Sequence, residues 1–472
     1  MAEQSTLYAA SGINFGAVTE FMDSCKKSKT DIHSLAVIHN GEVKLKLAPL
    51  PYSFDYKQHI YSLSKSFSAT AAGFLVDDGI ISIEDRIVDI FKDKCPEKIG
   101  RNLSKMRIKH LLSMNTGHNA CLLYNICRSN DPVRKFLSFE PENEPGTHFV
   151  YNNAATYILS ETVRRFTNMS MFDFLSIRLF EPLEITNTHW DSFADGNSQA
   201  ALGFYASAED MAKLGCLYLN KGVYNGKRIL SEDWTSAAVK TWSKNNSDAA
   251  PDWAAGYGFQ FWRNAAEGFR GDGAFGQLSV ALPSKNMVLA VQAYSEDTQA
   301  ELNYLYELSD KLFGASDVTE AELKDYADRY NKPAEFKSSN DSVFDKLYLC
   351  EKNDFDVSLV TFVDCSDGIE LRFSDGTVRQ TMKFGKNKFC ENRVVLKRLK
   401  PMIESISVDK KEPVHFVGCC TFEAGALMLY FNFLDNPHID KYVCTFNKNS
   451  LKMKKVKTAD FLYSGEIRGR LI

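Results

Sequence analysis

A serine stands three residues before a lysine at the head of an apolar run, and this arrangement constrains the chain more than any other feature. The pair is Ser62 and Lys65, and the following residues 68–76 predict a buried helix. If Ser62 begins that helix, Lys65 lies one turn further on the same side. A desolvated lysine loses its proton near neutral pH, so the pair predicts a serine nucleophile with its own base.

The spacing alone is a weak signal, because it occurs twice more in this chain. Ser24 and Lys27 lie in a charged stretch of a predicted helix, and Ser407 and Lys410 lie in a polar segment. Such pairs are typical of solvated surfaces. The apolar surroundings of Ser62 and the motifs downstream of it set the first pair apart.

The first 330 residues predict a sheet flanked by helices. Residues 12–29 form an amphipathic pattern, and Asn40-Gly41 between the β-rich runs 34–39 and 42–47 predicts a hairpin. Residues 257–263 and 277–294 are strand-like, the second run with a hairpin loop at 283–286. Helices are expected over about 300–313 and 319–330. We therefore predict an α/β (α+β) fold with a mixed antiparallel sheet, flanking helices and a helical subdomain.

The character of the chain changes after residue 330. Residues 331–340 are rich in Pro, Lys, Ser and Asn and predict a linker. Over residues 341–472 apolar side chains alternate with polar ones, as in Ile369, Leu371 and Phe373, and turn residues separate the runs. This pattern predicts a small antiparallel barrel. The predicted organisation is thus a hydrolase-like domain (1–330), a linker (331–340) and an all-β domain (341–472).

Composition excludes several classes of function. The net charge of −4 gives no support for nucleic-acid binding. The first residues carry an acid and no apolar run, and no stretch reaches the roughly 20 apolar residues that cross a bilayer. The 11 cysteines are odd in number and irregularly spaced, and the nine histidines do not cluster. We expect reduced thiols, a cytoplasmic location, no membrane partner, no metal and no organic cofactor.

A second element fits the Ser62 pair. Tyr151 and Asn153 stand two residues apart at the start of an apolar helix, after the Pro145-Gly146 turn. A phenol beside an ammonium is expected to shift toward phenolate, so Tyr151 is a candidate to take the serine proton and pass it to a leaving group. Asn153 is a candidate to orient Lys65 and a substrate amide. Tyr-x-Asn also occurs at Tyr218 and Tyr430, and a buried tyrosine with a structural hydrogen bond is the alternative.

These segments together resemble one family. The run 61–67, then Tyr151-Asn152-Asn153, then the run 269–277 (Phe-Arg-Gly-Asp-Gly-Ala-Phe-Gly-Gln) is similar to the serine β-lactamase and penicillin-recognising superfamily. The branch it resembles contains class C β-lactamases, D-stereospecific peptidases and family VIII esterases. The resemblance covers about residues 12–315. It implies an acyl-enzyme route in which Ser62 attacks a carbonyl while Lys65 and Tyr151 manage its proton, and it leaves open which of the two is the base.

The resemblance also implies the substrate-binding residues. The oxyanion would lie between the backbone N–H groups of Ser62 and Ala274, each worth about 3–4 kcal/mol. Gly271, Asp272 and Gly273 would form the strand beside the substrate. Many relatives carry a cationic or imidazole side chain where this chain has Gly271. Asp272 would repel an acidic substrate and attract an amine, unless it pairs with an arginine and never meets substrate.

We therefore predict a serine hydrolase for small amides, peptides or esters, weak on ordinary penicillins. The first alternative is a penicillin-binding-like sensor or scaffold that is acylated without useful turnover. The second gives the main role to the C-terminal domain, as a barrel that binds a lipid or peptide. D-peptidase relatives pair a catalytic domain with a lipocalin-like barrel, so by resemblance the barrel shapes the mouth of the active site instead.

Overall fold

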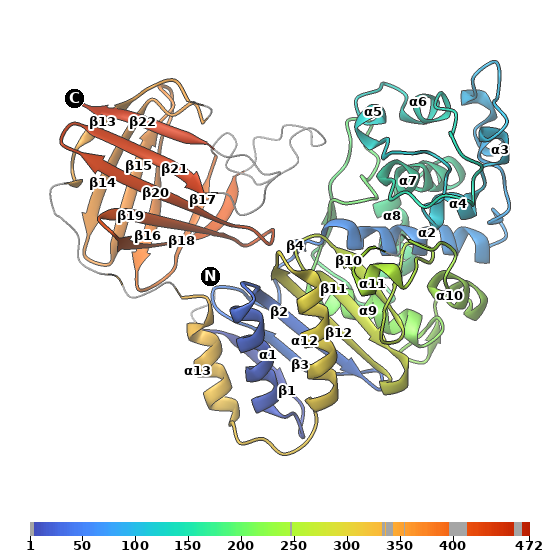
Figure 1. The fold of residues 1–472 in the computed structure, drawn as a ribbon, viewed down its shortest axis with the longest axis horizontal. Coiled ribbons are helices and arrows are strands. Elements are labelled where there is room, and N and C mark those ends of the chain that lie inside the picture. Colours follow the sequence, from blue (N-terminus) through green and yellow to red (C-terminus); the bar gives the residue numbers. More distant parts are fainter. Residues whose placement is uncertain are drawn as a thin grey trace.

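A seven-stranded antiparallel sheet forms the centre of the first domain (Figure 1). The protein is described by a computed structural model that covers residues 4–245, 248–332, 336, 343–353, 355–395, 413–456 and 465–472. The strand order is β1-β3-β2-β12-β11-β10-β9. The strands are β1 (Thr6–Ala9), β2 (Asp31–His39), β3 (Glu42–Ala48), β9 (Trp262–Arg263), β10 (Phe269–Gly273), β11 (Gln277–Leu282) and β12 (Met287–Tyr294).

Both predicted hairpins of this sheet are confirmed. β2 and β3 pair across the Asn40-Gly41 turn, and β11 and β12 pair across a short helix, η5 (Pro283–Lys285). The expected strand over 257–263 is mostly wrong, because only Trp262 and Arg263 pair as β9. Gly258 explains part of this. A Cβ there would lie 2.2 Å from the Ala238 carbonyl oxygen, so the backbone at this point packs against the Ala238 segment and not beside a strand.

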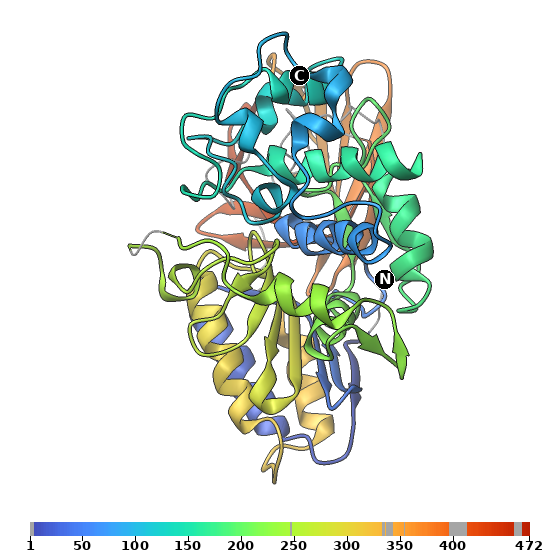
Figure 2. The same ribbon diagram turned by 90° about the vertical axis from the view of Figure 1, so that its right-hand side faces the viewer.

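Helices cover both faces of the sheet. One face packs on α1 (Phe15–Lys27), α12 (Thr298–Lys311) and α13 (Glu320–Tyr330), and shares an apolar core with them. α9 (Ala208–Leu219) packs on the other face, and α2 (Ser64–Asp77) lies beyond it. The helices predicted over 12–29, 300–313 and 319–330 are therefore present. Figure 2 shows α2 between the sheet and a group of helices on its far side.

That group is the predicted helical subdomain. Every residue of α2 from Ser64 to Leu75 is buried, and its small and apolar side chains pack on all sides of the helix. The remaining elements of this domain are short, apart from the 15-residue helix α7. They are β4 (Gln58–His59), η1 (Tyr61–Leu63), α3 (Ile87–Ile90), η2 (Lys92–Lys94), η3 (Leu103–Lys105), α4 (Ile108–Leu112), α5 (Leu123–Ile126), α6 (Pro132–Leu137), α7 (Asn153–Thr167), α8 (Met171–Leu175), η4 (Ser176–Phe180), β5 (His189–Trp190), β6 (Phe204–Ala206), β7 (Val223–Tyr224), β8 (Lys227–Arg228), α10 (Glu232–Val239) and α11 (Pro251–Ala254).

The C-terminal domain is the predicted antiparallel barrel. A parallel pairing of β16 with β18, at Gly385 and Cys419, closes a ring of nine strands, and β17 lies beside β18. The alternating residues Ile369, Leu371 and Phe373 all point into its core. The strands are β13 (Leu347–Cys350), β14 (Leu359–Cys365), β15 (Gly368–Ser374), β16 (Arg379–Lys386), β17 (Cys390–Val394), β18 (Val414–Glu423), β19 (Ala426–Phe433), β20 (Ile439–Asn447), β21 (Ser450–Val456) and β22 (Glu466–Leu471).

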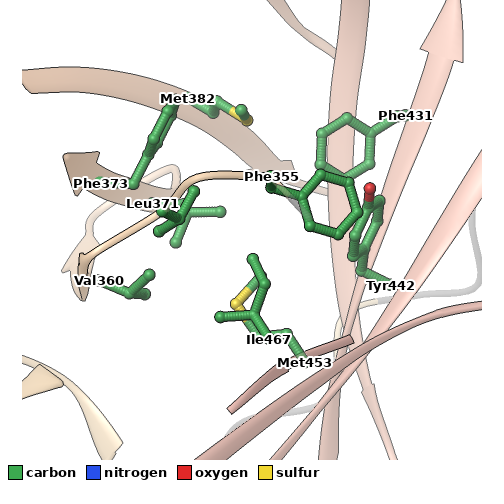
Figure 3. Close-up of a pocket in the computed structure, with 10 residues that line it drawn as sticks. Phe355, Val360, Leu371, Phe373, Met382, Phe431, Tyr442, Met453 and Ile467 are labelled. Carbon is green, nitrogen blue, oxygen red and sulfur yellow. The ribbon is translucent and has the colours of Figure 1, made fainter. Parts of the chain in front are cut away.

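Apolar side chains line a small cavity inside the barrel. Its volume is about 20 Å³, and its lining residues include Phe355, Leu371 and Tyr442 (Figure 3). That volume holds at most one water molecule. This cavity is therefore too small for a lipid or a peptide.

Two parts of the sequence analysis fall largely outside the described residues. Most of the predicted linker, residues 333–335 and 337–340, is not described, and neither are Ser407 and Lys410. The domain boundaries at 330 and 341 stay predictions.

Candidate active site

Ser62 lies in a single 3₁₀ turn, η1, that leads directly into α2. The residue before it, Tyr61, has a φ of +48°, a left-handed conformation that is unfavourable for a residue with a bulky side chain. The Ser64 hydroxyl donates to the Tyr61 carbonyl oxygen at 2.6 Å and helps to hold this turn. The turn presents the Ser62 side chain toward Lys65, one turn further along the chain.

Lys65 makes two hydrogen bonds from a site that is 1% exposed. Its Nζ donates to Ser62 Oγ at 2.9 Å and to the Ala201 carbonyl oxygen at 2.7 Å. Burial lowers the pKa of Lys65 to about 7, and the nearby Cys121 and Asp272 offset this only in part. A large fraction of Lys65 is therefore neutral at pH 7 and able to accept a proton.

Tyr151 completes the group. Its hydroxyl interacts with Ser62, which lowers the pKa of the phenol in part, and Lys65 Nζ lies 4.7 Å from the centroid of its ring. The ring is stacked on Trp262 at 6.0 Å. The three residues predicted from sequence therefore meet at one place.

The expected ionisation of Tyr151 is wrong in direction. Burial raises the pKa of the phenol. The interaction with Ser62 lowers this pKa in part, and the negative charge of Asp272 adds a smaller increase. The prediction considered the neighbouring ammonium but not the loss of water around the phenol. Tyr151 consequently keeps its proton at neutral pH.

Asn153 lies at the first turn of α7, directly after the N-cap residue Asn152. Its backbone N–H donates to Cys121 Sγ at 3.3 Å, and its side-chain Oδ1 is buried without a hydrogen-bond partner in the described part of the chain. Lys65 is hydrogen-bonded to Ser62 and Ala201, and its orientation by Asn153 stays a prediction. Contact between Asn153 and a substrate amide stays a prediction.

The third predicted segment, β10, lies against the Ser62 turn. A Cβ on Gly273 would lie 2.1 Å from the Ile60 carbonyl oxygen, and one on Gly271 would lie 3.0 Å from Leu63 Cγ. Glycine at both positions is what allows this approach. β9 pairs with β10 only at Phe269 and Arg270, so from Gly271 onward no described strand covers this edge.

Ala274 follows β10 and is exposed, and Phe275 after it has a φ of +65°. The backbone N–H of Ala274 was predicted to stabilise the oxyanion together with that of Ser62. The close approach of β10 to the Ser62 turn brings the two segments together, and the role itself stays a prediction.

Asp272 pairs with Arg270, as the alternative interpretation of this segment expected. Arg270 Nε donates to Asp272 Oδ2 at 2.9 Å, and Arg270 NH1 donates to the carbonyl oxygens of Asp252 and Arg263, each at 2.9 Å. The Arg270 side chain is 0% exposed and lies 4.7 Å above the Trp253 ring. Burial raises the pKa of Asp272, and Arg270 partly offsets the shift. The buried Arg270 is therefore not a free charge for a substrate.

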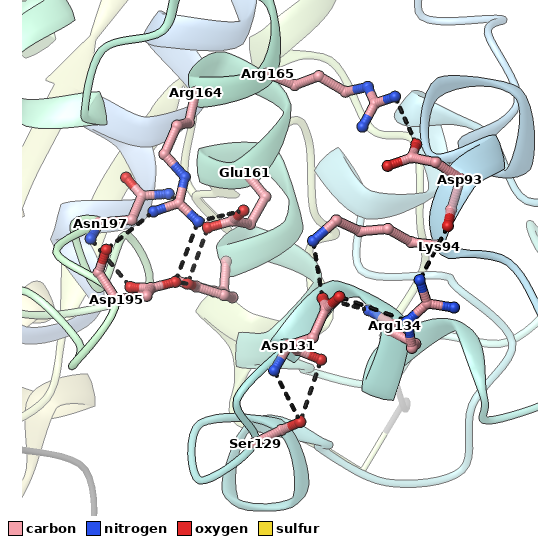
Figure 4. Close-up of polar contacts among 11 residues, drawn as sticks. Asp93, Lys94, Ser129, Asp131, Arg134, Glu161, Arg164, Arg165, Asp195 and Asn197 are labelled. Carbon is pink, nitrogen blue, oxygen red and sulfur yellow. Dashed lines mark hydrogen bonds and ion pairs between the residues drawn. The ribbon is translucent and has the colours of Figure 1, made fainter.

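A polar network holds the loop that carries Ala201 (Figure 4). Asn197 Nδ2 donates to Glu161 Oε1 at 2.8 Å, and Arg164 bridges Glu161 and Asp195 at 2.8 and 3.2 Å. Glu161 and Arg164 belong to α7, whose first turn follows Tyr151. The network therefore ties the loop that positions Lys65 to the helix that positions Tyr151.

Sequence reasoning missed the contribution of the barrel. The turn between β19 and β20 places His438 Nε2 2.6 Å from the Tyr61 hydroxyl, and the Asp435 carbonyl oxygen accepts from the His59 N–H at 2.8 Å. Tyr61 directly precedes Ser62, and His59 lies three residues before it. No local pattern around residue 438 signals this contact, because it depends on how the two domains pack.

Fold and site together define the β-lactamase and penicillin-binding-protein superfamily: an antiparallel sheet flanked by helices, with a Ser-x-x-Lys pair at the head of a buried helix. A sequence model of the family described as Beta-lactamase matches residues 19–309. The chain belongs to this family.

Known proteins with similar sequences cover only parts of the chain. The 6-aminohexanoate-dimer hydrolase of Paenarthrobacter ureafaciens is 23% identical over 237 residues, which is 45% of this chain and 58% of that protein. The D-aminopeptidase of Brucella anthropi is 27% identical over 164 residues, 31% of this chain and 30% of that protein. The matched stretches thus span about half or less of those relatives.

One solved structure matches both domains. The octameric penicillin-binding protein homologue from Pyrococcus abyssi has a TM-score of 0.50 and 16% identity, and the match covers 96% of this chain and 99% of that one. This likeness concerns the fold. None of the helices in the described ranges is long and apolar enough to cross a membrane.

Proposed function

We propose that the protein is a serine hydrolase that forms an acyl-enzyme at Ser62 with a small amide, peptide or ester. The observation that carries the proposal is the position of Ser62, which is hydrogen-bonded to Lys65 Nζ at 2.9 Å and interacts with the Tyr151 hydroxyl. Lys65 has a pKa of about 7, whereas Tyr151 keeps its proton. Burial thus shifts the two pKa values in opposite directions, which favours Lys65 as the base and Tyr151 as the proton donor.

The proposed reaction has two halves. In the first, Ser62 Oγ bonds to the substrate carbonyl carbon while its proton passes to Lys65. The bond to the leaving group then breaks, the leaving group takes a proton from Tyr151, and Lys65 restores that proton. In the second half, water attacks the carbonyl carbon of the ester at Ser62 and gives a proton to Lys65. The bond between Ser62 Oγ and the acyl group then breaks, and Lys65 passes that proton to Ser62 Oγ. The enzyme returns to its starting state.

The surroundings of β10 bear on the substrate. Gly271 offers no cation, and the guanidinium of Arg270 is buried and already bonded to Asp272 and to backbone carbonyls. A substrate carboxylate therefore finds no free positive side chain on this strand. We propose substrates that are uncharged near the scissile bond, and poor turnover of ordinary penicillins.

The other proposed attributes follow from the sequence. The relatives named as a 6-aminohexanoate-dimer hydrolase and a D-aminopeptidase support an amide as the scissile bond. A cytoplasmic location is proposed on the irregular spacing of the 11 cysteines, all of which are free thiols.

The test is the intact mass of the protein after treatment with a fluorophosphonate or a small activated ester. We expect one adduct on the wild type and none on Ser62→Ala. Ser24→Ala is the matched control, because Ser24 and Lys27 have the same spacing on the surface helix α1, and it should be labelled like the wild type. Absence of any adduct on folded wild-type protein contradicts the proposal.

A kinetic screen then separates hydrolase from sensor. p-Nitrophenyl esters, D- and L-amino-acid anilides and nitrocefin should give repeated turnover on at least one neutral substrate. An adduct that forms once and persists on every substrate would favour the sensor or scaffold, to which the missing cation at Gly271 also points.

A further inference from the structure

The turn between β19 and β20 enters the first domain beside β4 (Figure 1). It begins after Phe433 and ends at His438, whose side chain is 0% exposed. The turn is itself ordered, since the His438 N–H donates to Asn436 Oδ1 at 3.0 Å. The barrel thus presents a buried imidazole in a fixed position at the domain interface.

His438 contacts both segments that carry the predicted oxyanion donors. Its Nε2 lies 2.6 Å from the hydroxyl of Tyr61, the residue before Ser62. Its ring lies edge-on to the ring of Phe275, the residue after Ala274, with centroids 4.7 Å apart. Tyr61 and Phe275 also touch each other, with ring centroids 5.2 Å apart.

Both contacted residues have an unfavourable backbone conformation. Tyr61 has a φ of +48° and Phe275 a φ of +65°, and neither is a glycine. Such conformations persist only where the surroundings hold them. The N–H of Ser62 belongs to the peptide bond that follows Tyr61, and Phe275 anchors the segment that carries the N–H of Ala274.

We propose that His438 is a positioning residue, through which the C-terminal barrel fixes Tyr61 and Phe275 and thereby the two oxyanion donors. This inference rests on the proposed acyl-enzyme function. It gives the barrel a role in the chemical step rather than in binding a ligand or in gating the entry of substrate.

Docking of the two domains does not depend on this contact alone. A separate apolar cluster joins them, and the second hydrogen bond, from the His59 N–H to the Asp435 carbonyl oxygen, uses only backbone atoms. The cluster consists of Ala48, Leu50, Tyr52, Phe389, Val417, Cys419 and Leu434. A change at His438 is therefore expected to leave the domains in contact.

The test is a double-mutant cycle on Tyr61→Phe and His438→Ala, read as kcat and KM on a small neutral ester together with Tm. Each single variant should lower kcat at least tenfold, with KM changed less than threefold. The kcat of the double variant should be no lower than that of the less active single variant. His438→Gln keeps a hydrogen-bonding group near the Tyr61 hydroxyl and should recover part of kcat.

Phe389→Ala is the control for a loosened interface, and it should lower Tm while kcat stays within twofold of the wild type. Additive losses in the cycle, or a fall in kcat that follows Tm across all variants including Phe389→Ala, would overturn the inference. If His438→Ala does not fold, Tyr61→Phe and His438→Gln still decide it, since unchanged kcat in both contradicts it. A wild type that is never acylated is a different result, which removes the proposed function first.

Discussion

The Nζ of Lys65 lies 2.7 Å from the carbonyl oxygen of Ala201, a residue 136 positions away in the chain. Together with the 2.9 Å bond to Ser62 Oγ, this contact gives the amine a fixed place although water is excluded from it. Burial and fixation have different effects: burial lowers the pKa to about 7, and the carbonyl holds the nitrogen beside the serine. Both are needed for a lysine to act as a base.

The first prediction concerns the pH dependence of activity. Burial disfavours the charged amine, so Lys65 is protonated below about pH 7 and becomes available as a base above it. We expect kcat/KM on a neutral ester to rise with pH through an apparent pKa near 7. Lys65→Arg stays charged and should lose at least about a hundredfold in rate at pH 8. A flat profile from pH 5 to 9 in the wild type would contradict Lys65 as the base.

The second prediction concerns Tyr151 as a proton donor. Tyr151→Phe removes the hydroxyl that interacts with Ser62, and it keeps the ring stacked on Trp262. The rate should fall by about 10²–10⁴ on anilides, whose amine leaving group needs a proton. It should fall much less on p-nitrophenyl esters, whose leaving group departs as an anion. Tyr257→Phe, on the neighbouring ring, is the control. Equal losses on both substrate classes would argue against the role.

Local pattern was enough to predict much of the fold. The Asn40-Gly41 hairpin, the buried helix after Ser62 and the alternating strands of the barrel each depend on residues close together in sequence, and the structure contains all three. Ser62, Lys65 and Tyr151 were predicted as a group because three side chains of suitable chemistry appear in a fixed order.

The rest of the site depends on information that no local pattern carries. Ala201 contributes a backbone carbonyl, which every residue has, and His438 reaches Tyr61 across 377 positions through the packing of two domains. The predicted ionisation of Tyr151 was wrong because a sequence shows neighbouring charges but not the extent of burial.

The third prediction tests the close approach of β10 to the Ser62 turn. Gly273→Ala would place a Cβ 2.1 Å from the Ile60 carbonyl oxygen, so either β10 or the turn must move. We expect a loss of about 1–3 kcal/mol in the free energy of unfolding and, because a displacement near 1 Å costs about a hundredfold, a similar fall in kcat. Ala274→Ser, at the exposed next position, should leave the unfolding free energy within about 0.5 kcal/mol. Unchanged stability in Gly273→Ala would show that the approach is loose.

The fourth prediction concerns Glu301 in α12, whose carboxyl group is 0% exposed. Burial raises its pKa well above the ordinary value of 4.5, against a partial lowering by Ser295. Above pH 4.5 the unfolded chain releases this proton while the folded protein keeps it, so stability falls as pH rises. Glu301→Gln removes this effect, and its advantage in unfolding free energy should grow by up to about 1.4 kcal/mol per pH unit from pH 5 upward. Urea titrations of both proteins at pH 5 and pH 8 measure it. An advantage that does not change with pH would show that Glu301 is ionised in the fold.

The fifth prediction concerns the charge of Asp272. Its carboxylate raises the pKa of Lys65 and repels anions near β10, while it also neutralises the buried Arg270. Asp272→Asn should lower the apparent pKa of the rate profile below that of the wild type, and should raise kcat/KM for anionic nitrocefin relative to a neutral ester several-fold. The free energy of unfolding should fall, because the buried Arg270 loses the partner of its 2.9 Å ion pair. Glu267→Gln, at a half-buried acid just before β10, is the control for a general change in charge. The nitrocefin effect should persist at high salt in Asp272→Asn, since salt screens exposed charges far more than buried ones. If both variants alter the substrate ratio equally, the selectivity comes from the overall field of the protein rather than from Asp272.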